Sequence, residues 1–287
     1  MAEFRYVDEQ SPSGRPPVNT TLTKLRARQP VFGTWVSGSR DPAIMRMIAA
    51  AGFDFVFLDM EHSALSWETL GDHCNMARAS GLTPIIRTYG HDPAQTARAL
   101  DLGAMGIMHP MVNTPGQVRE LLDAALYPPA GSRGSTALSA PQDYLRLDPA
   151  TMKTHLNDIM LTIVQVEDVQ AVDRIEELAA VDGLDLVEIG REDLSTSMGL
   201  PLQVRHDQIM KAIERVATVC RTHGVAVGVN CSSMDDAREL LDAGVTCFSY
   251  LSDQRILLTA YYDAAAGFRR LLTDPRQPQA PPPLHPE

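Results

Sequence analysis

The chain has 287 residues, of which 44% are hydrophobic and 21% are charged, a composition that allows a large core to be buried. Its 25 basic and 36 acidic residues give a formal net charge of -11. The electric field of this negative charge repels nucleic-acid phosphates and anionic lipid headgroups, which argues against nucleic-acid and membrane partners. It would also repel an anionic substrate, which would therefore need a positive group or a metal ion at its binding site.

The two ends of the sequence are rich in proline and polar residues. Residues 1–20 and 273–287 are predicted to be flexible tails, because such segments bury too little apolar surface to offset the entropy of ordering. Residues 21–272 show no change of composition that indicates a linker, so they are predicted to form one domain. No signal core and no long apolar run is present, and the four cysteines form no C-x-x-C pair, which favours a cytoplasmic protein with free thiols.

Eight short apolar runs alternate with longer amphipathic segments along the chain. The runs are nearly continuous stretches of β-branched and aromatic residues, which is typical of parallel strands covered by helices. In chain order we predict strands at 31–37, 53–60, 83–89, 106–112, 161–167, 184–190, 225–230 and 246–251.

The segments between these runs carry helix signals. The segment that follows the first run begins with Asp41 and Pro42 and ends with Gly52, the pattern of an N-cap, a first turn and a helix end. Eight such βα units favour a (β/α)8 TIM barrel of the α/β class over an open doubly wound sheet. The absence of a G-x-G-x-x-G motif after the first strand and of a P-loop argues against a nucleotide-binding sheet.

Polar residues stand at the carboxyl ends of four of the predicted strands. Because these ends meet at one mouth of a barrel, where the chemistry of this fold lies, we expect the side chains to converge there. They are Asp59 to His62, Arg87, Gln165 to Asp168, and Gly190 to Asp193. Glu61 and Asp168 are interpreted as solvated residues or helix caps.

Two of these carboxylates indicate a metal. Glu167 and Asp193 come from neighbouring strands and would repel each other unless a cation lay between them. Oxygen ligands without a nearby His or Cys pair favour Mg2+ or Mn2+, and a 2-oxoacid could complete the coordination through its keto and carboxylate oxygens.

His62 and Arg87 have side chains suited to the remaining chemistry. The ordinary pKa of histidine allows His62 to carry protons near neutral pH, and Asp59 is expected to fix its tautomer. Arg87 stays protonated, so its predicted role is to stabilise an enolate oxygen and to hold the substrate. A structural ion pair for Arg87 is the alternative, and a structural role is the alternative for His62.

Over residues 22 to 270 the chain resembles the HpcH/HpaI class II pyruvate aldolases. The resemblance rests on motifs whose order and spacing agree with that family. They are Gly33-Thr34-Trp35, Asp59 to His62, the Arg87 of P-I-I-R, Tyr127 to Gly134, Val164 to Glu167, and Ile189 to Gly199.

The resemblance implies that Glu167 and Asp193 bind Mg2+ or Mn2+, with Co2+ as a further option. It implies that His62 and Asp59 relay protons through water and that Arg87 contacts the keto oxygen. It also implies that Trp35, Gln165 and the turn from Gly190 through Arg191 and Glu192 to Asp193 bind the substrate. The resemblance further implies a homo-oligomer, a hexamer or trimer of dimers, in which protomers exchange their last helix.

Two departures from the family pattern affect the expected substrate. Arg191 and Glu192 stand where the family commonly has Pro and a small residue, which would place two charges beside the carboxylate site. The segment of residues 135–144, which replaces a usual R-A element, is expected to shape the side that receives the aldehyde.

The predicted reaction is the reversible cleavage of a 4-hydroxy-2-oxoacid into pyruvate, or a close 2-oxoacid, and an aldehyde. The three lysines, Lys24, Lys153 and Lys211, lie outside the predicted strand ends, which argues against a Schiff base. A Claisen-type lyase or synthase acting on a CoA thioester is the alternative, although only Arg87, Arg133 and Arg191 are expected near the mouth. A barrel that binds without catalysis is a third hypothesis.

Overall fold

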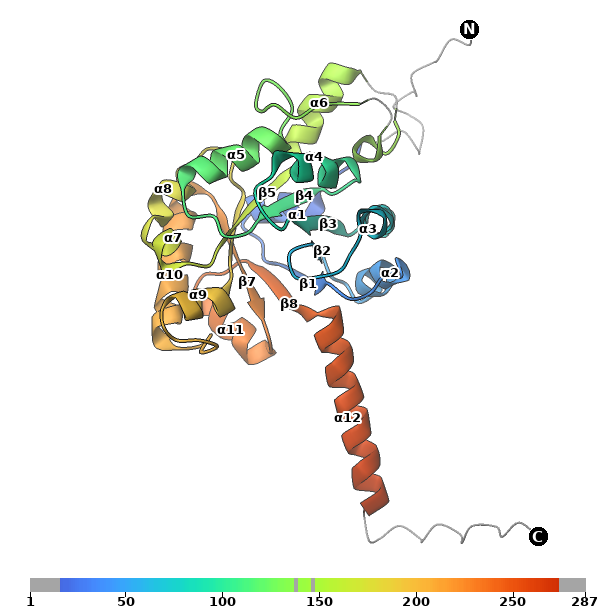
Figure 1. The fold of residues 1–287 in the computed structure, drawn as a ribbon, viewed down its shortest axis with the longest axis vertical. Helices are drawn as coiled ribbons and strands as arrows, with labels where there is room; N and C mark the ends of the chain where they lie inside the picture. Colours follow the sequence, from blue (N-terminus) through green and yellow to red (C-terminus); the bar gives the residue numbers. More distant parts are fainter. Residues whose placement is uncertain (1–15, 137–138, 146–147, 274–287) are drawn as a thin grey trace, which may run out of the picture.

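The computed structural model describes residues 16–136, 139–145 and 148–273, and its strands close into one parallel barrel (Figure 1). The strands pair in chain order, with β8 returning to β1. They are β1 (Val31–Val36), β2 (Phe55–Asp59), β3 (Thr83–Arg87), β4 (Gly106–His109), β5 (Leu161–Val166), β6 (Leu186–Ile189), β7 (Ala226–Cys231) and β8 (Cys247–Ser252). The predicted (β/α)8 barrel is confirmed, and each predicted strand contains one observed strand or overlaps it almost completely.

Helices surround the barrel, and several begin at the caps that the sequence indicates. Ser66, Asp92 and Ser233 each accept a hydrogen bond from a backbone N–H of the first turn, while Thr114 and Gln117 form a capping box. The helices around the strands are α2 (Ala43–Ala50), α3 (Trp67–Ala79), α4 (Pro93–Asp101), α5 (Pro115–Ala125), α6 (Pro149–Asp158), α7 (Val169–Asp173), α8 (Ile175–Ala179), α9 (Arg191–Ser197), α10 (Asp207–His223) and α11 (Met234–Asp242); the 3-10 turn η1 (Ala140–Gln142) precedes α6.

Side chains alternate between two cores along each strand. In β6, Val187 and Ile189 pack outward against the helices, whereas Leu186 packs into the barrel interior. The interior also holds Phe55, Phe57 and other large apolar side chains. Since strand residues alternate with period two, the position of any neighbouring residue, inside or outside, follows from this pattern.

A short helix, α1 (Thr20–Arg26), closes the barrel at the amino ends of the strands. Leu22 and Leu25 pack into the interior core, and the buried Asn19 caps the helix at Leu22. The Asn19 amide also donates to the carbonyls of Met105 and Ile159, at 3.0 and 2.9 Å. Asn19 is therefore part of the fold, although residues up to 20 were assigned to the N-terminal tail. The rest of both predicted tails, residues 1–15 and 274–287, lies outside the described residues.

The last helix, α12 (Asp253–Thr273), projects away from the barrel (Figure 1). Its first residue, Asp253, is buried and accepts hydrogen bonds from the backbone N–H groups of Ser37, Gly38 and Ser39, which follow β1. Further along, the helix exposes large apolar side chains, among them Leu257, Leu258, Tyr261, Tyr262 and Phe268. Among the described helices, none combines the length and hydropathy needed to span a membrane.

Replacement of Asn19 tests the closure of the barrel floor. Asn19→Ala removes the Asn19 donor from the Ile159 carbonyl, leaves the Met105 carbonyl with only the Leu161 N–H, and removes the helix cap, so we expect a loss of about 2–4 kcal/mol in the free energy of unfolding. Urea denaturation of the full chain measures it. Asn19→Ser keeps a capping oxygen without a buried charge and should recover part of the loss; an alanine variant as stable as the wild type would contradict this account.

Candidate active site

Arg87, the last residue of β3, lies at the centre of the carboxyl-end mouth. Its Nε and Nη2 contact Asp59 Oδ1 at 3.0 and 2.9 Å, and its Nη1 lies 3.0 Å from Glu61 Oε2 and 3.3 Å from Gln165 Oε1. The guanidinium carbon is also 4.5 Å from the centre of the Trp35 ring. Since Arg87 is buried, these contacts fix its orientation. Of the four strand ends expected to converge, those of β2, β3 and β5 meet at Arg87, and Trp35 of β1 lies beside them.

Asp59 organises the turn after β2 and does not touch the imidazole of His62. Its Oδ1 accepts hydrogen bonds from the backbone N–H groups of Glu61 and His62, at 3.0 and 3.3 Å, in addition to the contacts with Arg87. The expectation that Asp59 fixes the His62 tautomer is therefore wrong in this structure, because the carboxylate is already occupied by the arginine and the turn.

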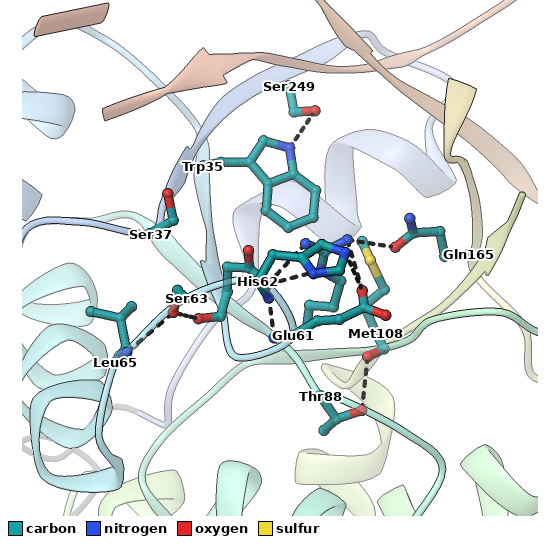
Figure 2. Close-up of polar contacts among 12 residues, drawn as sticks. Trp35, Ser37, Glu61, His62, Ser63, Leu65, Thr88, Met108, Gln165 and Ser249 are labelled. Carbon is teal, nitrogen blue, oxygen red and sulfur yellow. Dashed lines mark hydrogen bonds and ion pairs between the residues drawn. The ribbon is translucent and has the colours of Figure 1, made fainter. Parts of the chain in front are cut away.

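Glu61 takes the place beside the imidazole. His62 Nε2 lies 3.8 Å from Glu61 Oε2, while 67% of the His62 side chain is exposed at the rim of the mouth (Figure 2). Glu61 is mostly buried and paired with Arg87, so its interpretation as a solvated residue is wrong. Burial raises the pKa of Glu61, and the positive charges of Arg87 and His62 oppose this rise.

Glu167 follows β5 and is held by neutral donors. Its Oε1 accepts the backbone N–H of Met111 at 2.7 Å, and its Oε2 accepts the Gln165 amide at 2.6 Å. Met111 adopts a left-handed conformation, with a φ of 50°, that aims its N–H at the carboxylate. Gly190 leaves the space that Glu167 needs, since a Cβ there would lie 2.5 Å from Oε2. Burial raises the pKa of Glu167 to about 7.

Asp193 lies in the first turn of α9 near Glu167. It is exposed, and its negative charge contributes to the raised pKa of Glu167, as does that of Glu61. Within the described ranges no cluster of three or more His, Cys, Asp or Glu side chains forms a complete metal site. Glu167 and Asp193 nevertheless fit a hard divalent ion, because they are mutually repelling oxygen donors and each carboxylate retains free lone pairs.

The side chains of Arg191 and Glu192 differ in whether their charges are neutralised. Arg191 is buried and bidentate to Asp236 at 2.9 and 2.7 Å, and it also donates to the Asn230 carbonyl, so its charge is neutralised on α11. Glu192 is exposed, and one of its oxygens lies 3.7 Å from Arg255. The expectation that both charges stand beside the substrate carboxylate is wrong for the Arg191 side chain; its backbone position in the turn is as predicted.

Two further expectations about the mouth are also corrected. Arg133 pairs with Asp101 at 2.9 Å, at the end of α4. The described part of the 135–144 segment contacts Arg78 and Gly103, at the ends of α3 and α4. Helices run back to the amino ends of the strands, so both groups lie on the face opposite the mouth and cannot shape the aldehyde side.

A second polar group lies inside the barrel on the other side of the Trp35 ring (Figure 2). Trp35 Nε1 and Asn230 Nδ2 both donate to Ser249 Oγ, at 3.0 and 3.2 Å. Glu188 of β6 is 2% exposed, and while burial raises its pKa, the positive charge of Arg87 and the hydroxyl of Ser249, acting as a hydrogen-bond donor, oppose this rise. The sequence analysis missed Glu188, although a charged residue inside the apolar run L-V-E-I was a signal.

A cavity of about 520 Å3 opens beside His62. Glu61, His62 and Leu65 line one side of it, and Arg40 and Gln254 line it from the loop after β1 and the start of α12. The cavity thus gives a small molecule access to the exposed imidazole and to the Glu61 carboxylate beside it.

The fold and the site define a barrel enzyme with acid–base groups gathered around one buried guanidinium. Residues 32–260 match the model of the HpcH/HpaI aldolase/citrate lyase family. The chain belongs to this family, so the predicted family and the predicted aldehyde-lyase activity are confirmed.

Individual relatives agree with this assignment. A hydroxypyruvate/pyruvate aldolase of Pseudomonas aeruginosa is 32% identical over 254 residues, which cover 88% of this chain and 94% of the relative. A 4-hydroxy-2-oxo-heptane-1,7-dioate aldolase of Escherichia coli is 30% identical over 251 residues, 87% of this chain and 95% of the relative. The crystal structure of an HpcH/HpaI aldolase from Desulfitobacterium hafniense DCB-2 superimposes with a TM-score of 0.83 at 29% identity, covering 89% and 98% of the two chains.

The buried carboxyl of Glu188 predicts an unusual dependence of stability on pH. Burial raises its pKa from 4.5 to about 8, so the folded protein keeps a proton that the unfolded chain releases above about pH 4.5. In the wild type the free energy of unfolding should fall as pH rises through this window, by an amount on the order of a few kcal/mol, and should level off above pH 8. Glu188→Gln has no titrating carboxyl at this position, so it should lack this fall. Urea denaturation of both proteins at pH 5 and pH 8.5 measures the difference; parallel changes in the two would contradict it.

Proposed function

We propose that this enzyme is a class II aldolase that reversibly cleaves a 4-hydroxy-2-oxoacid into pyruvate, or a close 2-oxoacid, and an aldehyde. The observation that carries the proposal is the pair Glu167 and Asp193, two neighbouring carboxylates beside the fixed guanidinium of Arg87. Neither forms an ion pair with a Lys or Arg among the residues that the structure describes. The names of the two aldolase relatives support the substrate class.

Glu167 and Asp193 are the proposed ligands of a divalent cation, Mg2+ or Mn2+, with Co2+ as a further option. When bound, such an ion polarises the keto group of the oxoacid and stabilises negative charge on its oxygen. Hydrogen bonds from the Met111 N–H and the Gln165 amide fix the orientation of the Glu167 carboxylate. These neutral donors orient the carboxylate without neutralising its charge.

Arg87 stabilises the developing enolate oxygen in this proposal. Its fork is already oriented by Asp59, Glu61 and Gln165, so little reorganisation accompanies the reaction. The backbone N–H groups of the first turn of α9, from Gly190 to Asp193, lack partners within the helix and are proposed to hold the substrate carboxylate. Trp35 and Gln165 form the adjoining walls.

His62 carries the proton of the 4-hydroxyl group, through water, in the cleavage direction. The exposed imidazole can exchange protons with solvent, and the Glu61 carboxylate lies 3.8 Å from its Nε2. Asp59 contributes by holding the turn that carries Glu61 and His62. Its proposed role is therefore positional.

The Claisen-type alternative has less support. A CoA thioester brings phosphates that need several cations, and Arg191 is neutralised by Asp236 while Arg133 is remote from the mouth. Product analysis separates the alternatives: oxaloacetate with acetyl-CoA should give no condensation, while pyruvate with glyoxylate or succinic semialdehyde should give an aldol product. Unchanged aldehyde turnover by His62→Ala would instead favour a barrel without catalysis at this site.

Removal of the metal tests the mechanism directly. We expect a chelator to abolish aldol cleavage, and Mg2+ or Mn2+ to restore it, as measured by pyruvate release. Glu167→Gln and Asp193→Asn should each weaken Mn2+ binding, measured by calorimetry, and reduce turnover at least about a hundredfold. Glu177→Gln, which changes an exposed carboxylate on α8, is the control. Turnover that persists in metal-free enzyme would refute the proposal.

We also propose that the enzyme is a cytoplasmic homo-oligomer, a hexamer or trimer of dimers. The apolar side chains that α12 exposes support self-association, because such a contiguous apolar surface is uncommon on monomers. Its four free, buried cysteines suit a reducing compartment.

Charge placed on α12 should disrupt this association. Leu258→Asp with Tyr262→Asp is expected to shift the mass measured by light scattering toward that of the 31.4 kDa chain. Circular dichroism tests whether the barrel remains folded, and Glu177→Gln serves again as the control. A wild-type protein that is monomeric at micromolar concentration would contradict the oligomer.

A further inference from the structure

Glu188 occupies a place in the barrel that favours an apolar residue. It lies on β6 with the same orientation as Leu186, which packs into the interior core, and it is 2% exposed. Its flanking residues, Val187 and Ile189, face the helices. A carboxyl group at such a position loses its hydration, and one of its oxygens, Oε2, has no hydrogen-bond partner among the described residues. Among the described residues no cation forms an ion pair with Glu188, although the positive charges of Arg87 and Arg191 partly oppose the cost of burying it.

The surrounding residues are shaped around this side chain. Gly228 pairs with Glu188 across β6 and β7, and a Cβ at position 228 would lie 2.0 Å from Oε2. Any larger residue at 228 would therefore displace the carboxyl group. A glycine in the middle of a strand weakens it, so the pair combines two unfavourable choices at one point of the barrel.

Ser249 connects Glu188 to the reaction site. The Ser249 oxygen accepts N–H bonds from Trp35 and Asn230, so its single hydrogen is left to donate, and Glu188 is the acceptor. These three contacts fix the orientation of the Ser249 hydroxyl, so that its lone pairs point toward the N–H groups of Trp35 and Asn230. Without an acceptor at 188, the hydroxyl can turn and compete with the indole bond.

Trp35 in turn supports Arg87. The guanidinium lies over the indole ring at 4.5 Å, and its edges are held by Asp59, Glu61 and Gln165. A cation–π contact sets a separation but allows the ring to tilt and slide. The tilt of the indole is set by its N–H bond to Ser249 and by its packing on Phe57, at 4.5 Å between ring centres.

We infer that Glu188 is a positioning residue: through Ser249 it fixes the Trp35 indole, and thereby the face of Arg87 on which the enolate oxygen is stabilised. This inference rests on the function proposed for Arg87. It explains why a costly acid is kept where a leucine would pack, since displacement of a catalytic group by about 1 Å can reduce turnover about a hundredfold.

Substitutions at 188 and 249 test the link in the full-length enzyme. Glu188→Leu removes the acceptor, and we expect kcat to fall at least about tenfold with little change in KM, while the urea midpoint rises or stays the same. Glu188→Gln keeps an acceptor oxygen and should recover most of kcat. Ser249→Ala should reproduce the loss, and the Glu188→Leu/Ser249→Ala double variant should be no worse than either single variant. Cys247→Ala, a neighbouring interior change, controls for repacking.

Fluorescence gives a readout that does not depend on turnover. In a Trp67→Phe background Trp35 is the remaining tryptophan. Its emission should change in Glu188→Leu and Ser249→Ala and return in Glu188→Gln. Unchanged emission and kcat in Glu188→Leu, or additive losses in the double variant, would overturn the inference. If Glu188→Leu fails to fold, the other two variants test the inference: Ser249→Ala should lower kcat and change the Trp35 emission, and Glu188→Gln should leave both close to the wild type. A wild type without aldol turnover would refute the proposed function, while the emission data would still decide the Glu188–Ser249–Trp35 link.

Discussion

Negative charge concentrated around a single buried guanidinium is the constraint on which the site depends. Asp59 and Glu61 contact Arg87 directly, and the charge of Arg87 also opposes the raised pKa of Glu167. Carboxylates taken out of water need such compensation, since an isolated buried charge is costly. Arg87 cannot compensate all of them, because it contacts neither Glu167 nor Asp193. The mouth thus retains an excess of negative charge, which is the electrostatic condition for capturing a cation.

The barrel supplies the rigidity that this arrangement needs. Asp59, Arg87 and Gln165 lie on or at the ends of paired strands, and β2 and β3 align Asp59 with Arg87 in register. His62 and Asp193, the groups proposed to exchange with solvent or substrate, are exposed and stand on the turns that follow the strands. Preorganised electrostatics and exposed exchange groups are therefore separated between strand and loop, which is consistent with the way this fold supports catalysis.

The sequence predicted the strands well because buried parallel strands have a periodicity and composition that few other structures share. It also predicted which strand ends meet, since barrel topology brings all of them to one face. Side-chain partners were harder. Asp59 was assigned to His62 by sequence proximity, whereas the nearer charge in space is Arg87, 28 residues away. Arg191 was assigned to the pocket because Asp236, its partner on α11, lies 45 residues further along.

Other features were missed because they contradict local patterns. Glu188 stands within an apolar run, and its contacts with Gly228 and Ser249 come from two later strands. Asn19 stands in a segment rich in polar residues, yet it bonds carbonyls near residues 105 and 159. Long-range polar contacts of this kind leave no periodic trace in one sequence.

The root of α12 has a mechanical consequence. Asp253 ties the first turn of this helix to three consecutive amides after β1, in a loop whose residues, with Gln254, border the cavity beside His62. Twenty-one helical residues make a rod about 30 Å long. Because Asp253 anchors this rod to the loop after β1, a displacement of the helix would also move the residues that border the cavity. A protomer that binds α12 would therefore be coupled to the shape of the cavity beside His62.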